Sequence, residues 1–353
     1  MRIATALAVE GSVSQGFEVV RDTFEENFTR RGELGGACCA YYRGEKVVDL
    51  WGGVRDKVTG EPWQRDTMVI VYSATKGLAA MTLAMAHSRG WLDYEAPVAA
   101  YWPEFAQHGK DRMTVRLLLA HQGGLFAIDE PVDRTVVADL DALAVVLARQ
   151  KPRWEPGIHQ AYHAITLGFY EGELLRRLEI LAGFRPLRLM FDGMNPRSNL
   201  YRALIVNPGF AVALDARRVY ARNLEVPSGG GVATARGVAH AYSAFLEAEG
   251  DLMLRQQTLD LLASPAVPPT RGFHDECLQI DVQFSLGFMK PSAAWPFGSP
   301  QSFGSPGSGG SLGFADPRSK VAYGYVTSQM GTRLTGDPRD LALRKALYSV
   351  ILG

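Results

Sequence analysis

The chain has 353 residues, with 37 basic and 37 acidic side chains and therefore no formal net charge. A balanced charge supplies no basic surface for nucleic acid, and no run approaches the roughly 18 to 20 apolar residues that span a membrane. The apolar stretch near the N-terminus is also too short for a signal-peptide core. We expect a soluble, cytoplasmic protein with neither nucleic acid nor membrane as a partner.

The cysteines and histidines indicate neither disulfides nor a metal site. Cys38, Cys39 and Cys277 are odd in number and two are adjacent, which favours free thiols in a reducing compartment. No CxxC, HExxH or phosphate-loop motif is present. The sequence therefore predicts no metal and no cofactor, and it leaves self-association into a homo-oligomer open.

The predicted elements begin with an amphipathic helix, because apolar residues recur at helical spacing over 17–28. Two strand-like runs within 36–51 turn at 43–45, which predicts a hairpin. A further apolar run over 68–72 leads directly into a helix that Gly90 ends.

The middle of the chain, about 91–265, has a mostly helical pattern, whereas its last part returns to strands. Strands are predicted over 284–290 and 320–328, on either side of a stretch rich in Gly, Ser and Pro. Asp337-Pro338 begins a last helix, because Asp can cap it and Pro fits its first position.

This order of elements predicts an α+β chain. An α/β lobe is expected from about 1–72 and 270–353, with a mostly helical lobe of about 73–269 inserted between its parts. Clefts between lobes are common ligand sites, so we expect the functional site there.

The strongest chemical signal is Ser73-Ala74-Thr75-Lys76, at the predicted junction of strand and helix. The spacing places Ser73 and Lys76 on one helix face, about one turn apart. A serine hydroxyl needs a base to become a nucleophile, and a buried lysine can lose its proton to serve as one. About one S-x-x-K match is expected by chance in such a chain, but this match is the only one and has a fitting context.

Two weaker signals could complete a site around Ser73. Tyr162 follows a Trp-Glu-Pro-Gly stretch and could relay a proton, although a lone tyrosine is more often structural. The segment Ser305-Pro306-Gly307-Ser308 precedes a predicted strand, and its small residues would let a backbone N–H approach a ligand and steady an oxyanion. A surface loop is the plainer interpretation of this segment. His163, beside Tyr162, could line the same site.

Gly309-Gly310-Ser311-Leu312-Gly313 fits the G-x-S-x-G nucleophile elbow but lacks its context. The elbow requires a strand before the serine and a helix after it, whereas a strand-like run follows here. No histidine follows Ser311 to complete a triad, since the last one is His274. We therefore expect Ser311 to be structural, and we expect His121 to make a structural hydrogen bond at a helix end.

Taken together and in this order, the motifs resemble the serine β-lactamase and penicillin-binding-protein superfamily, and most of all its β-lactamase-like carboxylesterases of family VIII. The resemblance runs from about residue 15 to the C-terminus. Each piece alone is unspecific, but the combination is specific. The matching segments are Tyr72 to Gly77, Leu118 to Leu125, Trp154 to Gly157 with Tyr162 to Ala164, and Phe303 to Pro317.

The resemblance implies one catalytic unit over 1–353, in which helices flank an antiparallel sheet and the site lies between the sheet and a helical lobe. It implies that Ser73 is the acylated nucleophile. Lys76 and Tyr162 would share the proton transfers, and either could be the base. The backbone N–H groups of Ser73 and Ser308 would form the oxyanion hole, with Ser305 and Gly307 beside them.

Three departures from the family pattern shape the expected activity. Ala164 replaces the asparagine of the Tyr-x-Asn motif, and Ser305-Pro306-Gly307 replaces Lys-Thr-Gly or the His-x-Gly of the esterases. Both losses remove polar groups that a β-lactamase uses on its substrate, so they favour esters. Relatives also tend to have a longer stretch after Arg176-Arg177, so a segment near Leu178–Ile180 could be missing here.

These expectations favour a serine carboxylesterase that hydrolyses short to medium acyl esters through an acyl-enzyme on Ser73, with a small-molecule ester as its partner. Alternatives with the same chemistry are a β-lactamase or DD-peptidase and an acyltransferase to an alcohol or amine. A different class, a catalytically inactive binding or scaffold protein, is favoured only by the altered third motif. It predicts no adduct with a fluorophosphonate.

Overall fold

The computed structural model describes residues 9–182, 226–248, 250, 252–333 and 336–353. Its strands are β1 (Val9–Val13), β2 (Gly35–Tyr42), β3 (Glu45–Gly53), β4 (Val69–Ile70), β5 (Val232–Ala233), β6 (Gln283–Ser285), β7 (Phe288–Lys290), β8 (Phe303–Pro306), β9 (Leu312–Asp316) and β10 (Val321–Thr327). Its helices are α1 (Glu18–Arg30), α2 (Ala74–Ser88), η1 (Val98–Ala100), η2 (Pro103–Phe105), α3 (Val115–Leu119), α4 (Arg134–Ala138), α5 (Leu140–Arg149), α6 (Thr166–Ala182), α9 (Ala235–Ser243), α10 (Gln256–Ala263) and α11 (Pro338–Leu352).

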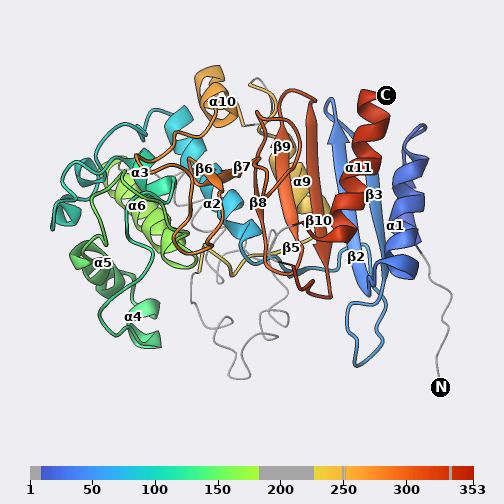
Figure 1. Cartoon of the computed structure of the whole chain (residues 1–353), viewed down its shortest axis with the longest axis horizontal. Helices are drawn as coiled ribbons and strands as arrows, with labels where there is room; N and C mark the ends of the chain where they lie inside the picture. The colour runs from blue at the N-terminus through green and yellow to red at the C-terminus, as the bar shows by residue number, and fades with distance from the viewer. Residues whose placement is uncertain (1–8, 183–225, 249, 251, 334–335) are drawn as a thin grey trace.

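One antiparallel sheet organises the fold, with the strand order β1-β3-β2-β10-β9-β8-β7-β6 (Figure 1). Its centre joins early and late parts of the chain, because β2 pairs with β10 and Gly36 lies opposite Thr327. The predicted hairpin is confirmed: β2 and β3 turn at Arg43 and Gly44, both at positive φ. A large antiparallel sheet flanked by helices is the α+β architecture that the sequence predicts.

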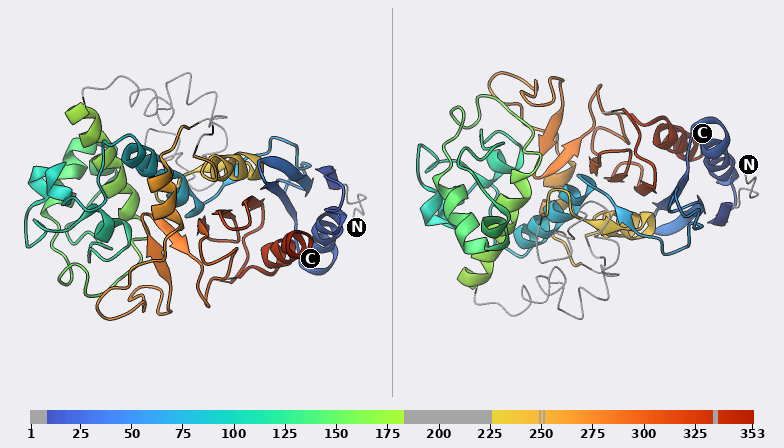
Figure 2. Two further views of the ribbon diagram at one scale, coloured as in Figure 1. Left: turned by 90° about the horizontal axis from the view of Figure 1, so that it is seen from above. Right: turned by 90° about the horizontal axis from the view of Figure 1, so that it is seen from below.

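Helices cover both faces of this sheet (Figure 2). On one face α1 and α11 pack against each other and contribute Phe24 and Leu343 to the core. On the other face α9 lies across β2, β10 and β9. Neighbouring residues of β2 divide between these faces: Cys38 packs with the α1 and α11 core, whereas Cys39 packs with Ala235 of α9. Because both faces are covered, the central strand β10 is buried along its whole length.

Two glycines allow α9 to lie this close to the sheet. Gly313 and Gly324 lie opposite each other on β9 and β10. A Cβ at Gly313 would lie 2.4 Å from the Val238 side chain, and one at Gly324 would lie 2.3 Å from the Ala235 carbonyl oxygen. A larger residue at either position would force the helix away from the strands.

A helical region packs beside the β6–β8 end of the sheet, around buried Leu118, Leu147 and Tyr170. Helix α2 is shared, because it packs on α6 and also on β7, β8 and β9. The range 73–269, expected to form the helical lobe, also contains α9. This helix does not belong to the helical region, because it packs on the sheet at β2, β9 and β10. The part of this range from 183 to 225 lies outside the described residues.

The described helices were compared with the length and apolarity that a membrane-spanning helix needs. Within the described ranges, no helix is both long enough and apolar enough to cross a bilayer. Helix α6 runs unbroken through Leu178 to Ala182. The stretch that follows, where relatives were expected to be longer, lies outside the described residues.

The single strand predicted over 284–290 is wrong, because this segment is a hairpin. Strands β6 and β7 pair through a turn at Leu286 and Gly287, both at positive φ. Leu286 is fully buried there, so burial of its side chain offsets the cost of a left-handed leucine. The apolar side chains of Phe284, Leu286 and Phe288 alternate as in one strand, which concealed this turn from a pattern-based prediction.

The C-terminal elements agree with the prediction. Strand β10 falls within the expected 320–328, and α11 begins at Pro338. The Asp337 side chain caps α11 by accepting a hydrogen bond from the Arg339 N–H at 2.9 Å.

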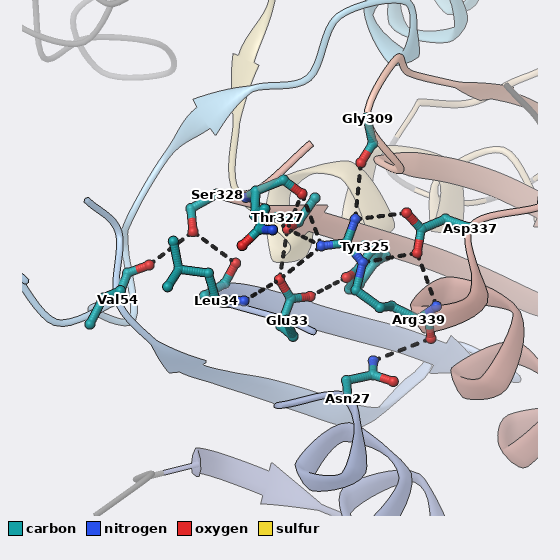
Figure 3. A network of polar contacts seen from close by, with 12 residues as sticks. Asn27, Glu33, Leu34, Val54, Gly309, Tyr325, Thr327, Ser328, Asp337 and Arg339 are labelled. Carbon is teal, nitrogen blue, oxygen red and sulfur yellow. Dashed lines mark hydrogen bonds and ion pairs between the residues drawn. The ribbon is translucent and has the colours of Figure 1, made fainter. Parts of the chain in front are cut away.

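A buried ionic network ties α11 to the sheet and to two loops (Figure 3). The Arg339 guanidinium donates to carboxylate oxygens of Asp337 at 2.7 Å and Glu33 at 3.2 Å. It also donates to the carbonyls of Gly309 at 3.2 Å and Gln329 at 2.9 Å. The network therefore connects the β8–β9 loop with the segment that follows β10.

Replacing Arg339 by Leu is expected to lower the free energy of unfolding by about 3–5 kcal/mol, because two buried carboxylates lose their partner. Urea unfolding followed by circular dichroism would measure the change. Arg55→Leu is the control, since the Arg55–Glu61 pair is partly exposed and should contribute less than about 1 kcal/mol. Equal losses in the two variants would contradict a structural role for the network.

Candidate active site

Ser73 stands at the junction of β4 and α2. The apolar run predicted over 68–72 forms only the two-residue strand β4, which pairs with β5. Tyr72 then takes a positive φ of 48°, and Ser73 follows as the N-cap residue of α2. Its side chain makes no capping hydrogen bond to the helix. The hydroxyl is therefore left for other partners.

Lys76 directs its amine to Ser73. The side chain is buried, and Nζ lies 3.2 Å from Ser73 Oγ. Nζ also donates to two backbone carbonyls, those of Ala164 at 2.6 Å and Ser228 at 2.8 Å. An uncharged amine has two N–H bonds and one lone pair. When both N–H bonds of the uncharged amine donate to these two carbonyls, its lone pair is directed toward the Ser73 hydroxyl.

Burial also sets the charge of Lys76. Desolvation lowers its pKa to about 7, although the carboxyl of Glu171 acts in the opposite direction. A lysine with such a pKa is substantially uncharged at neutral pH. Lys76 therefore meets the chemical requirement for a general base toward Ser73.

Tyr162 approaches Ser73 from the other side. Its hydroxyl donates to Ser73 Oγ over 2.7 Å. Burial raises the pKa of Tyr162 to about 12, despite the opposing effect of that hydrogen bond. The phenol therefore keeps its proton at neutral pH and can donate it, whereas the Lys76 amine can accept one.

Asp275 holds the backbone of Tyr162 in place. One carboxylate oxygen accepts from three backbone N–H groups: Tyr162 at 3.1 Å, Cys277 at 2.9 Å and Leu278 at 2.8 Å. Asp275 is fully buried. No sequence pattern singled out Asp275, because it is more than 100 residues from Tyr162 along the chain.

The segment 305–308 forms one wall beside Ser73, and its residues differ in what they contribute. Ser305 donates its hydroxyl to the Ser73 carbonyl at 2.6 Å, so it braces the turn. Gly307 is pressed against this turn, since a Cβ there would lie 2.0 Å from the Val71 carbonyl oxygen. Its own N–H donates to the Ser311 carbonyl at 2.7 Å.

Two backbone N–H groups are left for a ligand. Neither Ser73 N nor Ser308 N donates a hydrogen bond to any residue within the described ranges. Both residues line the same cavity. This pair of N–H groups fits the oxyanion hole that the resemblance implies.

His163 does not reach the cavity, which corrects the expectation that it lines the site. It is fully buried, its Nε2 accepts from the Leu125 N–H at 3.1 Å, and its Nδ1 lies 2.8 Å from the Ala161 carbonyl. His121 lines the cavity instead and accepts from the His163 N–H through Nδ1 at 3.0 Å. Burial lowers the pKa of both rings, that of His163 to about 3.

The cavity at Ser73 has a volume of about 300 Å³. Its apolar walls come from the β6–β7 hairpin and nearby loops, and its rim carries Ser308, Thr332 and Arg333. Such a mixture of apolar walls and a few convergent polar groups is typical of small-molecule sites. The apolar lining residues are Leu278, Phe284, Met289, Trp295, Pro306 and Met330.

Ser311 is placed as a structural residue. It is buried, it does not line the cavity, and the strand β9 follows it directly. The strand–serine–helix context of a nucleophile elbow is therefore absent around Ser311.

Several residues of the site escaped prediction from the sequence. Ser228 supplies a carbonyl to Lys76, and its hydroxyl binds the start of α6 by accepting from the Gly168 N–H at 2.6 Å. The Gly229-Gly230-Gly231 run after it was a usable signal, since such a run permits close backbone contact. The cavity-lining position of His121 and the position of Glu171 had no such signal.

The antiparallel sheet, the adjoining helical region and the Ser–Lys–Tyr cluster between them define a serine hydrolase. The sequence profile of the Beta-lactamase family matches residues 20–347. The chain belongs to the Beta-lactamase family.

Two solved structures share this fold, and one curated protein is similar in sequence over most of its length. The crystal structure of a family VIII carboxylesterase superposes with a TM-score of 0.84 at 33% identity, covering 97% of this chain and 100% of that one. A penicillin-binding protein homologue from Caulobacter crescentus gives a TM-score of 0.81 at 29% identity, with 97% and 100% covered. The esterase/beta-lactamase LipL of Mycobacterium tuberculosis is 29% identical over 91% of this chain and 83% of its own.

Proposed function

We propose that the protein is a carboxylesterase that hydrolyses short to medium acyl esters through an acyl-enzyme on Ser73. One observation carries the proposal: Ser73 Oγ lies 3.2 Å from the Lys76 amine and 2.7 Å from the Tyr162 hydroxyl. It does so at an apolar cavity of about 300 Å³. A nucleophile, a base and a proton donor thus meet at one point, as ester cleavage requires.

In the proposed acylation, Ser73 Oγ attacks the ester carbonyl carbon while its proton passes to Lys76. The N–H groups of Ser73 and Ser308 stabilise the charge that develops on the carbonyl oxygen. The carbon–oxygen bond to the alcohol then breaks, and the alcohol leaves with the proton of Tyr162. The Lys76 ammonium returns a proton to the phenolate. Water repeats the sequence in deacylation, which releases the acid and restores Ser73.

Three features support esters over β-lactams. Ala164 offers Lys76 only its backbone carbonyl, where an asparagine side chain would add polar groups. The Ser305 hydroxyl is committed to the Ser73 carbonyl and is not directed to a substrate. Relatives named as esterases include the family VIII carboxylesterase and LipL, although LipL is also named as a beta-lactamase.

The test is hydrolysis of p-nitrophenyl butyrate and of nitrocefin by the same preparation. Intact mass spectrometry after fluorophosphonate treatment accompanies it. We expect ester turnover, one covalent adduct per chain, and nitrocefin turnover at least about 100-fold slower in kcat/KM, because a site without matched polar groups discriminates by that order. Faster nitrocefin turnover would favour a β-lactamase, and no turnover with no adduct would favour a scaffold protein. Ester products formed with added alcohols would identify acyl transfer.

We also propose that the protein acts in the cytoplasm. The thiols of Cys38, Cys39 and Cys277 are all free, which suits a reducing compartment. Fractionation of cells that express the protein at native level would test this, and enrichment in an oxidising compartment would contradict it.

A further inference from the structure

The loop that carries the Ser308 N–H is closed on itself but has a flexible backbone. Its ends meet where the Gly307 N–H donates to the Ser311 carbonyl at 2.7 Å. Between these ends, Gly309 and Gly310 have positive φ values of 90° and 115°. Adjacent glycines give a backbone more conformational freedom than other residues do. The direction of the Ser308 N–H therefore depends on contacts from outside the loop.

The outside contacts are made to the Gly309 carbonyl (Figure 3). This oxygen accepts from Arg339 Nη2 at 3.2 Å and from the Gly331 N–H at 2.8 Å. Gly331 comes two residues after Gln329, whose carbonyl accepts from Nη1 of the same guanidinium at 2.9 Å. Arg339 thus holds the loop directly, and it also holds the segment that supplies the second donor.

The Asp337 carboxylate fills the space beside both segments. A Cβ at Gly310 would lie 2.7 Å from Asp337 Oδ2, and one at Gly331 would lie 2.2 Å from the same atom. Arg339 fixes this carboxylate, because Nη2 donates to Oδ2 at 2.7 Å and Nε donates to Oδ1 at 2.9 Å. The Arg339 residue is only 3% exposed, so these contacts are strong ones in a low dielectric. The ion pair therefore leaves the loop little room to move toward α11.

Two peptide units connect this support to the cavity. In a planar trans peptide the C=O and the N–H point in opposite directions. The Gly309 C=O faces Arg339. The N–H of the same unit belongs to Gly310 and donates to the Gly307 carbonyl at 3.2 Å. The N–H of that second unit belongs to Ser308, which lines the cavity. Fixing the Gly309 carbonyl therefore fixes the direction of the Ser308 N–H.

We propose that Arg339 is a positioning residue for the oxyanion hole, which holds the Ser308 N–H toward the substrate carbonyl oxygen through these two peptide units. The inference rests on the proposed acyl-enzyme on Ser73, because the charge at this N–H develops in that reaction. Every hydrogen bond of the chain runs in one direction, from the guanidinium to the developing oxyanion. Hydrogen bonds in such a chain polarise one another, which makes the Ser308 N–H a stronger donor.

The test compares p-nitrophenyl butyrate with its thiono analogue, in which sulfur replaces the carbonyl oxygen, in the full-length protein. Sulfur is a weak hydrogen-bond acceptor, so an ordered oxyanion hole favours the oxygen ester. Arg339→Lys keeps the charge but presents a single nitrogen, which cannot reproduce the guanidinium fork between the carboxylates and the Gly309 carbonyl. We expect kcat/KM for the oxygen ester to fall about 100-fold, the usual effect of losing one oxyanion donor. The preference for oxygen over sulfur should fall by at least about tenfold.

Arg344→Lys is the matched control, with the same substitution in a buried ion pair of the same helix. Arg344 pairs with Asp340 at 2.8 Å and donates to the Pro296 carbonyl at 2.7 Å. This variant should keep the wild-type preference. A purely structural loss slows both esters by the same factor, so it also leaves the preference unchanged.

Asp337→Asn is a second and milder variant. It removes one of the two acceptors that fix the guanidinium, and it keeps the cap of α11, because asparagine caps helices as well as aspartate does. The oxygen-to-sulfur preference should fall in this variant too, by less than in Arg339→Lys. Circular dichroism would show that each variant is folded under the assay conditions.

A further readout is independent of catalysis. Hydrogen–deuterium exchange of peptides that contain 307–311 reports how often the loop opens, because the Gly307 and Gly310 amides are both hydrogen-bonded within it. Exchange at these amides should be faster in Arg339→Lys than in the wild type. Arg344→Lys should follow the wild type in this loop.

The outcomes separate this inference from the proposed function. Ester turnover with an unchanged preference in both Arg339→Lys and Asp337→Asn would overturn the positioning role and leave Ser73 as the nucleophile. Equal exchange at 307–311 in Arg339→Lys and the wild type would also overturn it. If the wild type neither cleaves an ester nor forms a fluorophosphonate adduct, the proposed function fails and this inference fails with it.

Discussion

Replacing Ser73 by Ala is expected to abolish the fluorophosphonate adduct and to lower kcat/KM for p-nitrophenyl butyrate by at least about 10⁴-fold, because the variant lacks the hydroxyl that forms the proposed acyl-enzyme. The fold should survive, since the Ser73 side chain makes no capping hydrogen bond to α2. The Ser305 brace binds the Ser73 backbone carbonyl, which alanine retains. Initial rates and intact mass, with circular dichroism as a check on folding, measure the effect.

Ser311→Ala is the control for this experiment. Ser311 is a buried serine in a G-x-S-x-G sequence and does not line the cavity. Its contact with Gly307 uses the backbone carbonyl, which the substitution leaves intact. Activity that persists in Ser73→Ala and disappears in Ser311→Ala would reverse the assignment of the nucleophile.

Replacing Lys76 by Met should lower kcat/KM by about 10³-fold, the usual contribution of a general base. In the wild type, activity should fall as pH drops through about 7, because protonation of Lys76 removes the lone pair that takes the serine proton. Activity should hold on the alkaline side, because the pKa of Tyr162 lies at about 12. Lys76→Met should lose this acidic limb as well as the rate.

Lys110→Met is a matched control for the loss of a buried lysine. Lys110 is also fully buried, and its Nζ donates to two carbonyls, Ala148 at 3.0 Å and Gln150 at 2.7 Å. It does not line the cavity. If Lys110→Met loses stability but keeps the pH profile, the effect at Lys76 is chemical. An acidic limb near pH 7 that persists in Lys76→Met would mean that another group is the base.

The sequence predicted those parts of the fold that local patterns specify. The helix over 17–28, the hairpin that turns at Arg43 and the capped start of α11 at Asp337 each depend on neighbouring residues. The pairing of β2 with β10 depends on distant residues, and no local pattern contains it. The β6–β7 turn was missed because its Leu286 is buried and apolar, like the strands on either side.

The site residues also differ in whether neighbouring or distant parts of the sequence determine their positions. Ser73 and Lys76 are one helical turn apart, so their spacing alone predicted that they meet. Tyr162 gave only a weak signal of its own, because it reaches Ser73 from a distant segment, and the resemblance strengthened it. The carbonyls of Ala164 and Ser228 accept hydrogen bonds from Lys76. Every residue has a backbone carbonyl, so the residue types at these positions could not predict this contact. Placing His163 at the site failed because its partners, Leu125 and His121, come from another segment.

The pairing of β2 with β10 has a consequence for how the chain reaches its fold. Strand β2 is complete near residue 42, but its partner begins only at Val321. At translation rates of about 5–20 residues per second, β2 waits on the order of tens of seconds on the ribosome for this neighbour. During that time the early hairpin exposes an unpaired, largely apolar edge, which is a template for aggregation. Production of this protein should therefore depend on the nascent-chain chaperones of its host.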